Sequence, residues 1–231
     1  MSGLFITFEG TEGGGKSTQI HLTADWLESQ GREVLTLREP GGTPISEEIR
    51  HLLKHSEVNH NMTAEAELLL MNASRAQLVR EVINPAMEAG KTILCDRFYD
   101  STTAYQGYGR QLDLNSVATL IDFAVGETRP NLTLLLRVPI SISQERQQQR
   151  RDEAAENTAA PKGSTTHVPL HFDDVGRDRF EEADRAFFER VEKGFRAISQ
   201  AEPYRVKVID ATKSIEEVQE QIRKLITPIL K

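Results

Sequence analysis

The sequence predicts an α/β fold with three layers: a five-stranded parallel sheet with helices on both faces, completed by a mobile lid. Two observations lead to this prediction. Short apolar segments typical of strands alternate along the chain with longer segments of helical periodicity, and this alternation favours a parallel sheet covered on both sides. The pattern also runs through the chain without an internal repeat or a domain linker, so we expect one domain over residues 1–231.

The expected strands are short segments that favour β structure. The segment at residues 132–138 is a near-continuous apolar run, as a strand buried on both faces should be. The segment at residues 33–38 alternates apolar and polar residues, and a short apolar strand ends at Asp96. The complete set is residues 4–9, 33–38, 92–95, 132–138 and 204–209.

Apolar residues at helical spacing predict helices between these strands. Pro44 is well placed to open the second helix, because proline fits the first helical turn. The apolar face of that helix would consist of Ile45, Ile49, Leu52 and Leu53. A long pattern over residues 63–88 predicts a helix broken near Pro85, since proline removes a backbone donor. Residues 152–176 hold few apolar side chains, so we expect a loop there, within a lid at about residues 146–180. One more helix is expected after the first strand and the phosphate loop. The remaining expected helices cover residues 114–125, 141–151, 177–200 and 215–229.

The chemistry begins with the glycine-rich segment between the first strand and the first helix. It reads Gly-Thr-Glu-Gly-Gly-Gly-Lys-Ser and matches the phosphate-loop pattern, so we expect a P-loop NTPase fold. Glycines let backbone N–H groups turn toward phosphate oxygens, and the helix adds the positive end of its dipole. Lys16 can reach the β- and γ-phosphates of a nucleotide, and the Ser17 hydroxyl can ligate Mg²⁺. The expected nucleotide-binding residues are Gly10, Thr11, Glu12, Gly13, Gly14, Gly15, Lys16, Ser17 and Thr18.

Two further polar segments follow predicted strands at the same edge of the sheet. Residues 38–42 follow the second strand, and Asp96 and Arg97 follow the third. Ligands of open parallel sheets gather at the carboxyl ends of the strands, so these segments and the phosphate loop should share one rim. Asp96 stands where a P-loop enzyme places an acid near Mg²⁺ or its water shell; an ordinary cap of the following segment is the alternative.

Arginines are well supplied near this rim, at Arg38, Arg75 and Arg97. Arg150 and Arg151 precede the expected lid loop, although that stretch could also be a solvated helix end. Transfer of a phosphoryl group between two anions needs positive charge on donor, acceptor and transferring group. Glu12 is an unusual negative charge beside phosphates, and the sequence leaves open whether it faces solvent, a cation or a sugar hydroxyl.

Three classes of P-loop protein compete for this chain. A GTPase switch needs Asp-x-x-Gly after a strand, but residues 173–176 match it only within the polar loop, and residues 212–215 lack the aspartate of the guanine motif. A partitioning-type ATPase carries an extra lysine early in the loop, where this chain has Glu12. A phosphotransferase that acts on a small phosphorylated acceptor under a closing lid fits best.

Composition narrows the partners. The net charge of −7 argues against nucleic acid and anionic membranes, which it would repel. The single cysteine, Cys95, excludes an internal disulfide and suits a reducing compartment. No basic leader precedes the first strand, and no apolar run approaches transmembrane length. We therefore expect a cytoplasmic protein that binds neither nucleic acid nor a membrane.

Three motifs, in order along nearly the whole chain, resemble those of one family. They are residues 8–18, which open with Phe-Glu-Gly, residues 38–43, which read Arg-Glu-Pro-Gly-Gly-Thr, and residues 96–106, which hold Asp-Arg-Phe, Ser101 and Ala-Tyr-Gln. By these motifs the chain resembles the thymidylate kinases, nucleoside monophosphate kinases of the P-loop superfamily. The resemblance implies that Mg·ATP and dTMP give ADP and dTDP, a step of dTTP biosynthesis.

The resemblance also implies roles for single residues. Arg38 and Arg97 would hold the dTMP phosphate, and Arg75 would hydrogen-bond the thymine edge. Thr102 and Tyr105 would line base and sugar, with Tyr105 excluding a ribose 2′-hydroxyl. The phosphate-loop chemistry above makes Ser17 and Asp96 the expected metal ligands and Lys16 an expected catalytic residue. The resemblance adds Arg97, Arg150, Arg151 and Glu12 as implied catalytic residues.

Two family features bear on this chain in particular. The family commonly stacks a phenylalanine on thymine, and this sequence has Met71 there, whose polarizable thioether can also cover a ring face. The family is usually homodimeric through helices, which makes residues 63–88 the candidate dimer surface.

Two alternatives stay open. A deoxynucleoside kinase shares the architecture but accepts a hydroxyl group, and it would need an acid as base near the sugar 5′ end; Glu9 or Asp96 could be argued for that role. A P-loop ATPase regulatory module would use ATP only as a conformational switch and would hydrolyse it without depending on an acceptor.

Overall fold

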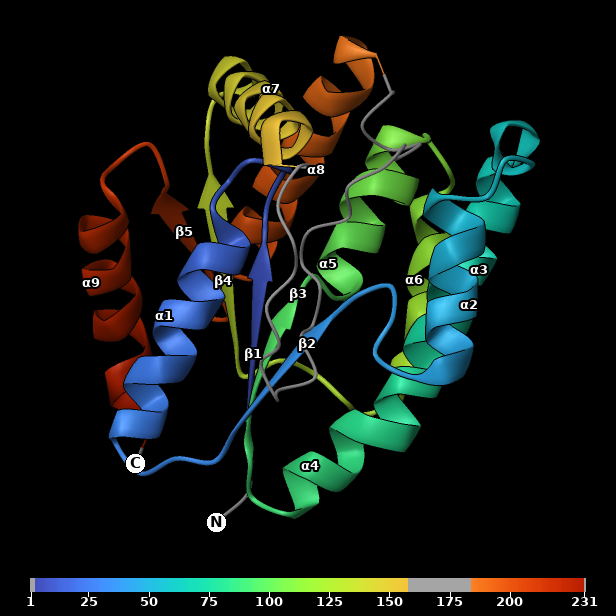
Figure 1. Cartoon of the computed structure of the whole chain (residues 1–231). Helices are drawn as coiled ribbons and strands as arrows, with labels where there is room; N and C mark the ends of the chain where they lie inside the picture. The colour runs from blue at the N-terminus through green and yellow to red at the C-terminus, as the bar shows by residue number, and fades with distance from the viewer. Residues whose placement is uncertain (1–2, 158–183, 231) are drawn as a thin grey trace.

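We describe the protein from a computed structural model, which covers residues 3–157 and 184–230; the side chains of residues 150, 151 and 153–157 lie outside this description. The described residues form one five-stranded, all-parallel sheet with the order β2-β3-β1-β4-β5 (Figure 1). The strands are β1 (Leu4–Glu9), β2 (Val34–Arg38), β3 (Thr92–Asp96), β4 (Leu132–Arg137) and β5 (Val206–Asp210). The predicted parallel sheet is confirmed, with strand ends that differ from the expected ones by one or two residues.

The central strand β1 is buried along its whole length, so both faces of the sheet are covered. Leu4, Ile6 and Phe8 point to one face, where they pack with α1 (Lys16–Ser29) and α9 (Ile215–Ile226). Phe5 points to the opposite face and packs with residues of α3 (Ala64–Leu78) and α6 (Leu114–Val125). Figure 1 shows the resulting layers, with α1 and α9 on one side of the sheet and α3 and α6 on the other. The predicted three layers are therefore confirmed.

The long helical pattern over residues 63–88 forms in three pieces. The helix α3 begins after the cap Thr63, whose side chain accepts a hydrogen bond from the Ala66 N–H. A π-helical turn follows, and α4 then contains Pro85 in its first turn. A break at this proline was predicted, because proline cannot donate to the helical ladder. The later pieces are the π turn Val79–Ile83 and α4 (Asn84–Glu88).

The helix α2 (Pro44–Lys54) begins where Pro44 was expected to open it, but of the predicted apolar face only Leu53 is fully buried. Its buried side chains are Ser46, Arg50 and Leu53. Ile45 and Leu52 are exposed by 57% and 37%. Beside Leu53, the inner side of α2 contacts polar backbone: the Ser46 hydroxyl donates to the Ser74 carbonyl of α3, and Arg50 donates to the Pro40 carbonyl in the loop after β2.

Residues 99–109 form helical structure that the sequence pattern did not predict. The helix α5 (Tyr99–Thr102) passes directly into a π-helical segment, Thr103–Gly109, which packs along α8 (Arg185–Ala201). Glycines allow this close approach: a Cβ on Gly109 would lie 2.6 Å from the Phe187 ring, and one on Gly194 would lie 2.9 Å from the Tyr108 ring. A π segment has a period other than 3.6, so its apolar residues give no ordinary helical pattern.

The helix α7 (Ile140–Asn157) corrects one prediction. Residues 152–157 were expected to begin a loop, but they continue the helix, because a polar sequence that is free of proline and glycine can extend a helix into solvent. The rest of that expected loop, and the lid at about 146–180 from residue 158 onward, lie outside the described residues. The remaining described elements are the short 3₁₀ turns Asn59–Asn61 and Thr227–Ile229.

Candidate active site

The phosphate loop connects β1 to α1 in the predicted way. A Cβ on Gly10 would lie 2.2 Å from the Leu136 carbonyl oxygen, so only glycine fits this crossing over β4. Lys16 is 7% exposed, and its Nζ donates to the carbonyls of Gly10 and Thr11 at 3.3 and 3.1 Å. The loop therefore curls around the lysine, whose ammonium lies at the amino end of α1, where phosphates bind in such loops.

The start of α7 supports this loop from the other side of the sheet edge. The Ser143 hydroxyl donates to the Glu12 carbonyl at 2.6 Å, and Arg146 donates to the Gly13 carbonyl at 3.3 Å and to the Ala211 carbonyl at 3.1 Å. The loop is thus tied to the connections that follow β4 and β5. This bracing role of Arg146 depends on the strand order, which sequence spacing does not give.

Asp96 lies next to the loop, as the shared rim predicted. The Ser17 hydroxyl donates to Asp96 Oδ2 at 3.5 Å, while Asp96 Oδ1 is buried without a hydrogen-bond partner among the described residues. A hydroxyl and a carboxylate with an unused oxygen fit Mg²⁺, which takes oxygen ligands and keeps several waters. Within residues 3–157 and 184–230, no group of three or more His, Cys, Asp or Glu side chains could hold a metal by itself.

Arg97 joins the acceptor side of the rim to the phosphate loop. Its Nη2 lies 2.6 Å from Glu12 Oε1 and donates to the Tyr105 hydroxyl at 3.2 Å. Tyr105 in turn donates to Glu12 Oε2 at 2.7 Å, which closes a ring of three charged or polar groups, and the guanidinium lies 5.0 Å from the centre of the tyrosine ring. Burial alone would raise the pKa of Glu12, but Arg97 and Lys16 outweigh it and lower that pKa to about 2. Glu12 is therefore ionised at neutral pH and directed at Arg97.

The backbone of Arg97 is held in a left-handed conformation, with φ of 69°. A positive φ is uncommon for a residue other than glycine. It is found at functional sites where the backbone must direct a side chain in an unusual way. Two bonds fix it: the Arg97 N–H donates to the Phe8 carbonyl at 2.9 Å, and the Cys95 thiol donates to the Arg97 carbonyl at 3.1 Å. The consequence is that the guanidinium turns back over the sheet edge toward the phosphate loop.

A buried ion pair forms the far wall of the site. Arg75 Nε and Nη2 both donate to Glu39 Oε2, at 2.8 and 2.7 Å, and both side chains are at most 3% exposed. Arg75 Nη1 also donates to Asn72 Oδ1 at 3.3 Å, and the guanidinium packs over the Phe98 ring at 5.5 Å. The pair holds the arginine with one carboxylate oxygen, so its donors are fixed in direction.

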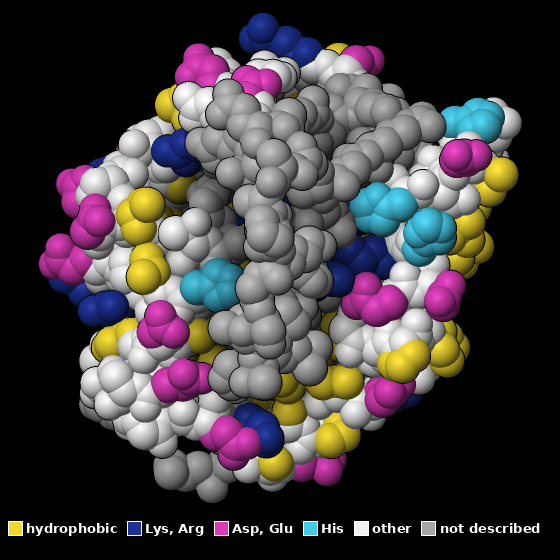
Figure 2. Space-filling model, in the orientation of Figure 1, with side chains coloured by type: hydrophobic (Ala, Val, Ile, Leu, Met, Phe, Trp, Pro, Cys, Tyr) yellow, Lys and Arg dark blue, Asp and Glu magenta, His cyan; other side chains and the backbone are white. Residues whose placement is uncertain are grey.

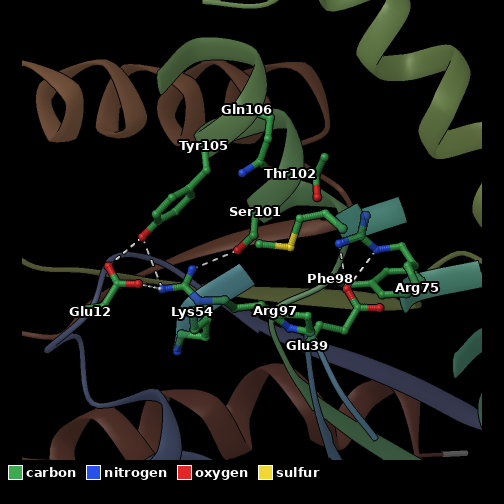
Figure 3. Close-up of a pocket in the computed structure, with 12 residues that line it drawn as sticks. Glu12, Glu39, Lys54, Arg75, Arg97, Phe98, Ser101, Thr102, Tyr105 and Gln106 are labelled. Carbon is green, nitrogen blue, oxygen red and sulfur yellow. Dashed lines mark hydrogen bonds and ion pairs between the residues drawn. The ribbon is translucent and has the colours of Figure 1, made fainter. Parts of the chain in front are cut away.

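These groups surround one pocket, which Figure 3 shows with Arg97, Glu12 and Tyr105 on one side and Arg75 and Glu39 on the other. Met71 also lines this pocket. The complete lining is Glu12, Glu39, Pro40, Lys54, Met71, Arg75, Arg97, Phe98, Ser101, Thr102, Tyr105 and Gln106. The structure therefore brings together the predicted acceptor residues Met71, Arg75, Arg97, Thr102 and Tyr105 in one cavity beside the phosphate loop.

Arg38 was predicted to hold the acceptor phosphate, but it does not line this pocket. Arg38 points to α2, where it makes a two-pronged pair with Glu47 at 3.1 and 3.0 Å and donates to the Pro40 carbonyl. Arg150 and Arg151 lie in α7, and their side chains are outside the described part of the chain. The Arg38 arrangement depends on the shape of the loop after β2, which sequence spacing does not give.

Several lining residues were missed as site residues: Glu39, Pro40, Lys54, Phe98, Ser101 and Gln106. Most of them belong to the quoted motifs at residues 38–43 and 96–106. The motifs therefore indicated these residues, but the sequence analysis assigned them no role. Gln106 is fixed from behind by Glu67, a fully buried carboxylate that also pairs with Arg110 at 3.0 Å. Lys54 had no sequence signal, because it looks like an ordinary charge near a helix end.

A P-loop beside a second pocket rich in arginine, on the same edge of a five-stranded parallel sheet, defines a kinase-type nucleotide phosphotransferase. The family model described as thymidylate kinase matches residues 8–222. This chain belongs to the thymidylate kinase family.

Similarity to individual proteins agrees with the family match. The chain is 46% identical over 215 residues to a thymidylate kinase of Chlorobium luteolum, covering 93% of this chain and 92% of that protein. It is 43% identical over 230 residues to one of Pseudomonas fluorescens, covering 100% and 98%. Among solved structures, the crystal structure of thymidylate kinase from Ehrlichia chaffeensis superposes with a TM-score of 0.70 at 29% identity, over 98% of this chain and 99% of that one.

Proposed function

We propose that this protein transfers the γ-phosphoryl group of ATP to the phosphate of dTMP, giving ADP and dTDP. The observation that carries this function is the pocket between Arg97 and Arg75, next to Lys16 of the phosphate loop. A nucleotide in that pocket would have its phosphate near Arg97 and Glu12 and its base near Arg75 and Met71. The family membership supports dTMP as that nucleotide.

In this reaction an acceptor phosphate oxygen forms a bond to the γ-phosphorus, and the bond from that phosphorus to the β–γ bridging oxygen breaks. The acceptor is already an anion, so the protein needs positive charge and positioning more than a base. Lys16 would stabilise charge on the donor phosphates, and Arg97 would hold the acceptor phosphate. Burial, followed by the charge of Arg97, lowers the pKa of Lys16 to about 8, so at neutral pH this lysine is still a cation.

Mg²⁺ is part of the proposal. Ser17 and Asp96 would hold it together with oxygens of the nucleotide and water, as the unused Asp96 oxygen supports. When bound, the ion would neutralise charge on the β- and γ-phosphates.

Arg150 and Arg151 remain our proposed catalytic residues from the lid side, and Arg38 a proposed phosphate ligand. For Arg38 this requires that its pair with Glu47, whose side chain is 43% exposed, opens or is shared. A competing role follows directly from the contacts: Arg38 shapes the loop that carries Glu39. The variant Glu47→Gln separates the two roles, because it frees Arg38 and should lower the KM for dTMP only if Arg38 reaches the phosphate.

The experiment that tests the function is ADP release with Mg·ATP and one of five acceptors: dTMP, dUMP, dCMP, dGMP or thymidine. A strong and selective response to dTMP supports the proposal. A response to thymidine would favour a deoxynucleoside kinase instead. Hydrolysis that is independent of any acceptor would favour a P-loop regulatory module.

We also propose a homodimer, formed through the exposed apolar side chains of α2, α3 and α6. Ile45, Leu69 and Phe123 are exposed by 57%, 54% and 81%, and Leu52 by 37%. The helices α2, α3 and α6 pack side by side, and Figure 2 shows hydrophobic side chains along the edge where Figure 1 places α2 and α3. A contiguous exposed apolar patch marks an interaction surface. Sedimentation of wild type and of Phe123→Glu tests it: the variant should be a monomer, and an unchanged mass would exclude this surface.

The composition of the chain supports proposals about its other binding partners and its location in the cell. The net charge of −7 supports a protein that binds neither nucleic acid nor anionic membranes, and the single cysteine supports a cytoplasmic location. None of the helices in the described ranges 3–157 and 184–230 is long and apolar enough to span a bilayer.

A further inference from the structure

Glu9 is a fully buried carboxyl group that no step above uses. It is the last residue of β1 and lies beneath the start of α5, which has no capping side chain of its own. Glu9 Oε1 accepts hydrogen bonds from the backbone N–H groups of Phe98 and Ser101, at 2.8 and 3.4 Å. Glu9 Oε2 lies 2.5 Å from the Ser101 hydroxyl oxygen. The carboxyl group thus caps α5 from a neighbouring strand.

Ser101 connects this carboxyl group to the acceptor pocket. Its side chain lines the pocket, and its hydroxyl oxygen accepts a hydrogen bond from Arg97 Nη1 at 2.9 Å (Figure 3). A serine hydroxyl has one hydrogen to donate and two lone pairs that accept. One lone pair accepts from Arg97. The direction of the single hydrogen therefore depends on whether the Glu9 carboxyl accepts a hydrogen bond from Ser101 or donates one to it.

The two charge states of Glu9 require different things. An ionised carboxylate only accepts, so the Ser101 hydrogen must point back to Glu9 Oε2 and cannot point into the pocket. A neutral carboxyl carries its proton on Oε2, because Oε1 already accepts two N–H groups. That proton is donated to the second lone pair of the Ser101 oxygen, and the serine hydrogen is then directed into the pocket.

The surroundings of Glu9 favour the neutral state. Burial, followed by the negative charge of Asp100, raises the pKa of Glu9 to about 8, against the opposing effects of Ser101, Arg97 and the Phe98 N–H. Asp100 is itself held by Arg205 at 2.7 and 2.9 Å, on the side away from the pocket. The other titratable groups that interact with Glu9 are Lys16 on α1 and the Cys95 thiol on β3.

We propose that Glu9 is a positioning residue that sets the direction of the Ser101 hydroxyl, and so whether that hydroxyl donates to the phosphate of the acceptor nucleotide. The inference rests on the proposed function, because it takes the anion in the pocket to be the dTMP phosphate. An anion there favours the arrangement that donates to it, and therefore favours the proton on Glu9. Acceptor binding and protonation of Glu9 are coupled, each strengthening the other.

This coupling has a measurable sign. At pH 8.5, part of the free protein carries an ionised Glu9, so binding of dTMP takes up a fraction of a proton from solution. Calorimetry in two buffers of different ionisation enthalpy measures that uptake directly. The phosphate of dTMP is already fully ionised at this pH, so the nucleotide itself contributes little. Lys16 also titrates near this pH, and it is present in every variant compared.

The variant Glu9→Gln copies the neutral acid: its carbonyl accepts from the Phe98 N–H, and its amide donates to Ser101. We expect dTMP affinity at pH 7 within about threefold of wild type, since all bonds are kept. Proton uptake at pH 8.5 should fall well below that of wild type. The matched control is Glu220→Gln, which neutralises an exposed glutamate of α9 and should keep the wild-type affinity for dTMP and the wild-type proton uptake.

Ser101→Ala gives an independent measurement. It removes the hydroxyl but leaves Glu9, so dTMP should bind about fivefold to tenfold more weakly at pH 7, as the loss of one hydrogen bond to an anion predicts. Its proton uptake at pH 8.5 should also fall, because Glu9 no longer senses the anion through the hydroxyl.

The inference is overturned if Glu9→Gln binds dTMP with the same proton uptake as wild type, or if Ser101→Ala binds as tightly as wild type at pH 7. A wild-type protein that fails to bind and phosphorylate dTMP would instead remove the proposed function itself. The two failures are therefore distinguishable in one set of titrations.

Discussion

Arg97 and Glu12 face each other across the rim of the sheet, with Arg97 Nη2 2.6 Å from Glu12 Oε1. The two residues come from different connections, since Arg97 follows β3 and Glu12 lies in the phosphate loop after β1. The pair therefore ties the acceptor side of the site to the donor side. Tyr105 donates to the same carboxylate, so the loop position, the guanidinium and the pocket wall are set together.

Arg97→Ala is expected to lower kcat/KM for dTMP by about 10²–10³-fold, as loss of one preorganised charge contact does at a reacting phosphate. Glu12 would then lose its main counter-charge and be free to repel phosphates. Steady-state kinetics with dTMP varied at saturating ATP measures the effect. Arg185→Ala, which removes a 77% exposed arginine on α8, serves as the control and should leave the kinetics unchanged. Normal dTMP kinetics in Arg97→Ala would remove this residue from the site.

Lys16→Ala should reduce turnover by about 10²–10³-fold while the fold stays intact, since the lysine contacts only loop carbonyls in the described structure. Single-turnover rates with Mg·ATP and dTMP, together with thermal unfolding, separate chemistry from stability. Lys193→Ala on the exposed face of α8 is the matched control. A Lys16→Ala enzyme with an unchanged rate would contradict the role of the phosphate loop.

Glu39→Ala should destabilise the protein by about 3–5 kcal/mol, because it leaves the Arg75 guanidinium buried without its partner. It should also raise the KM for dTMP, since the direction of the Arg75 donors is lost. Urea unfolding gives the stability change. An exposed pair, Lys224 with Glu220, offers the contrast: Glu220→Ala should change stability far less, because water screens the pair. Equal changes in the free energy of unfolding for the two variants would show that the buried pair contributes no more to stability than the exposed pair.

Met71→Phe should lower the KM for dTMP about threefold to tenfold, because a rigid ring gives up less freedom than methionine when it stacks on a base. Turnover at saturation should stay near that of wild type, since Met71 does not touch the transferring phosphate in the proposed arrangement. Measuring KM for dTMP and dUMP side by side shows whether the gain comes from the ring face. A higher KM for both would mean that the pocket has no room for phenylalanine.

The raised pKa of Glu9 predicts a change of stability with pH. Between the ordinary glutamate pKa of 4.5 and the folded value of about 8, the native state holds a proton that the unfolded chain has released. Stability conferred by this proton therefore falls as pH rises through that window, by up to about 1.4 kcal/mol per pH unit. Glu9→Gln lacks this dependence. Unfolding curves at pH 5, 6, 7 and 8 should show wild type losing stability relative to Glu9→Gln, and parallel curves would contradict the neutral carboxyl.

The sheet and the phosphate loop were predictable because their signals are local. Each strand is a short apolar segment, and the loop pattern fixes both the residue types and the strand and helix on either side. The meeting of Asp96 and Arg97 with the loop followed from one rule of parallel sheets, without any contact being known. That rule placed the residues at the rim but could not say which of them pair.

The rest depended on packing between distant segments. The pairing of Arg38 with Glu47 needs the fold of the loop after β2, and the helix at residues 99–109 hides its pattern in a π segment. The sequence pattern indicated only that Glu9 belongs to a strand. Its role beneath α5 follows from its contact with Ser101, which the sequence does not show. Of the apolar residues predicted to face the core from α2, Leu53 is buried but Ile45 and Leu52 are exposed, because part of the inner side of the helix contacts polar backbone.

The close contact between α8 and the π-helical segment has a mechanical consequence. Where Gly109 meets Phe187 and Gly194 meets Tyr108, no flexible side chain separates the two elements, so they must shift together or not at all. Tyr105 sits on that segment and packs edge-on against Phe187 and Phe195 of α8. A shift of α8 would therefore also displace Tyr105, so the width of the pocket depends in part on a helix that contributes none of its lining residues.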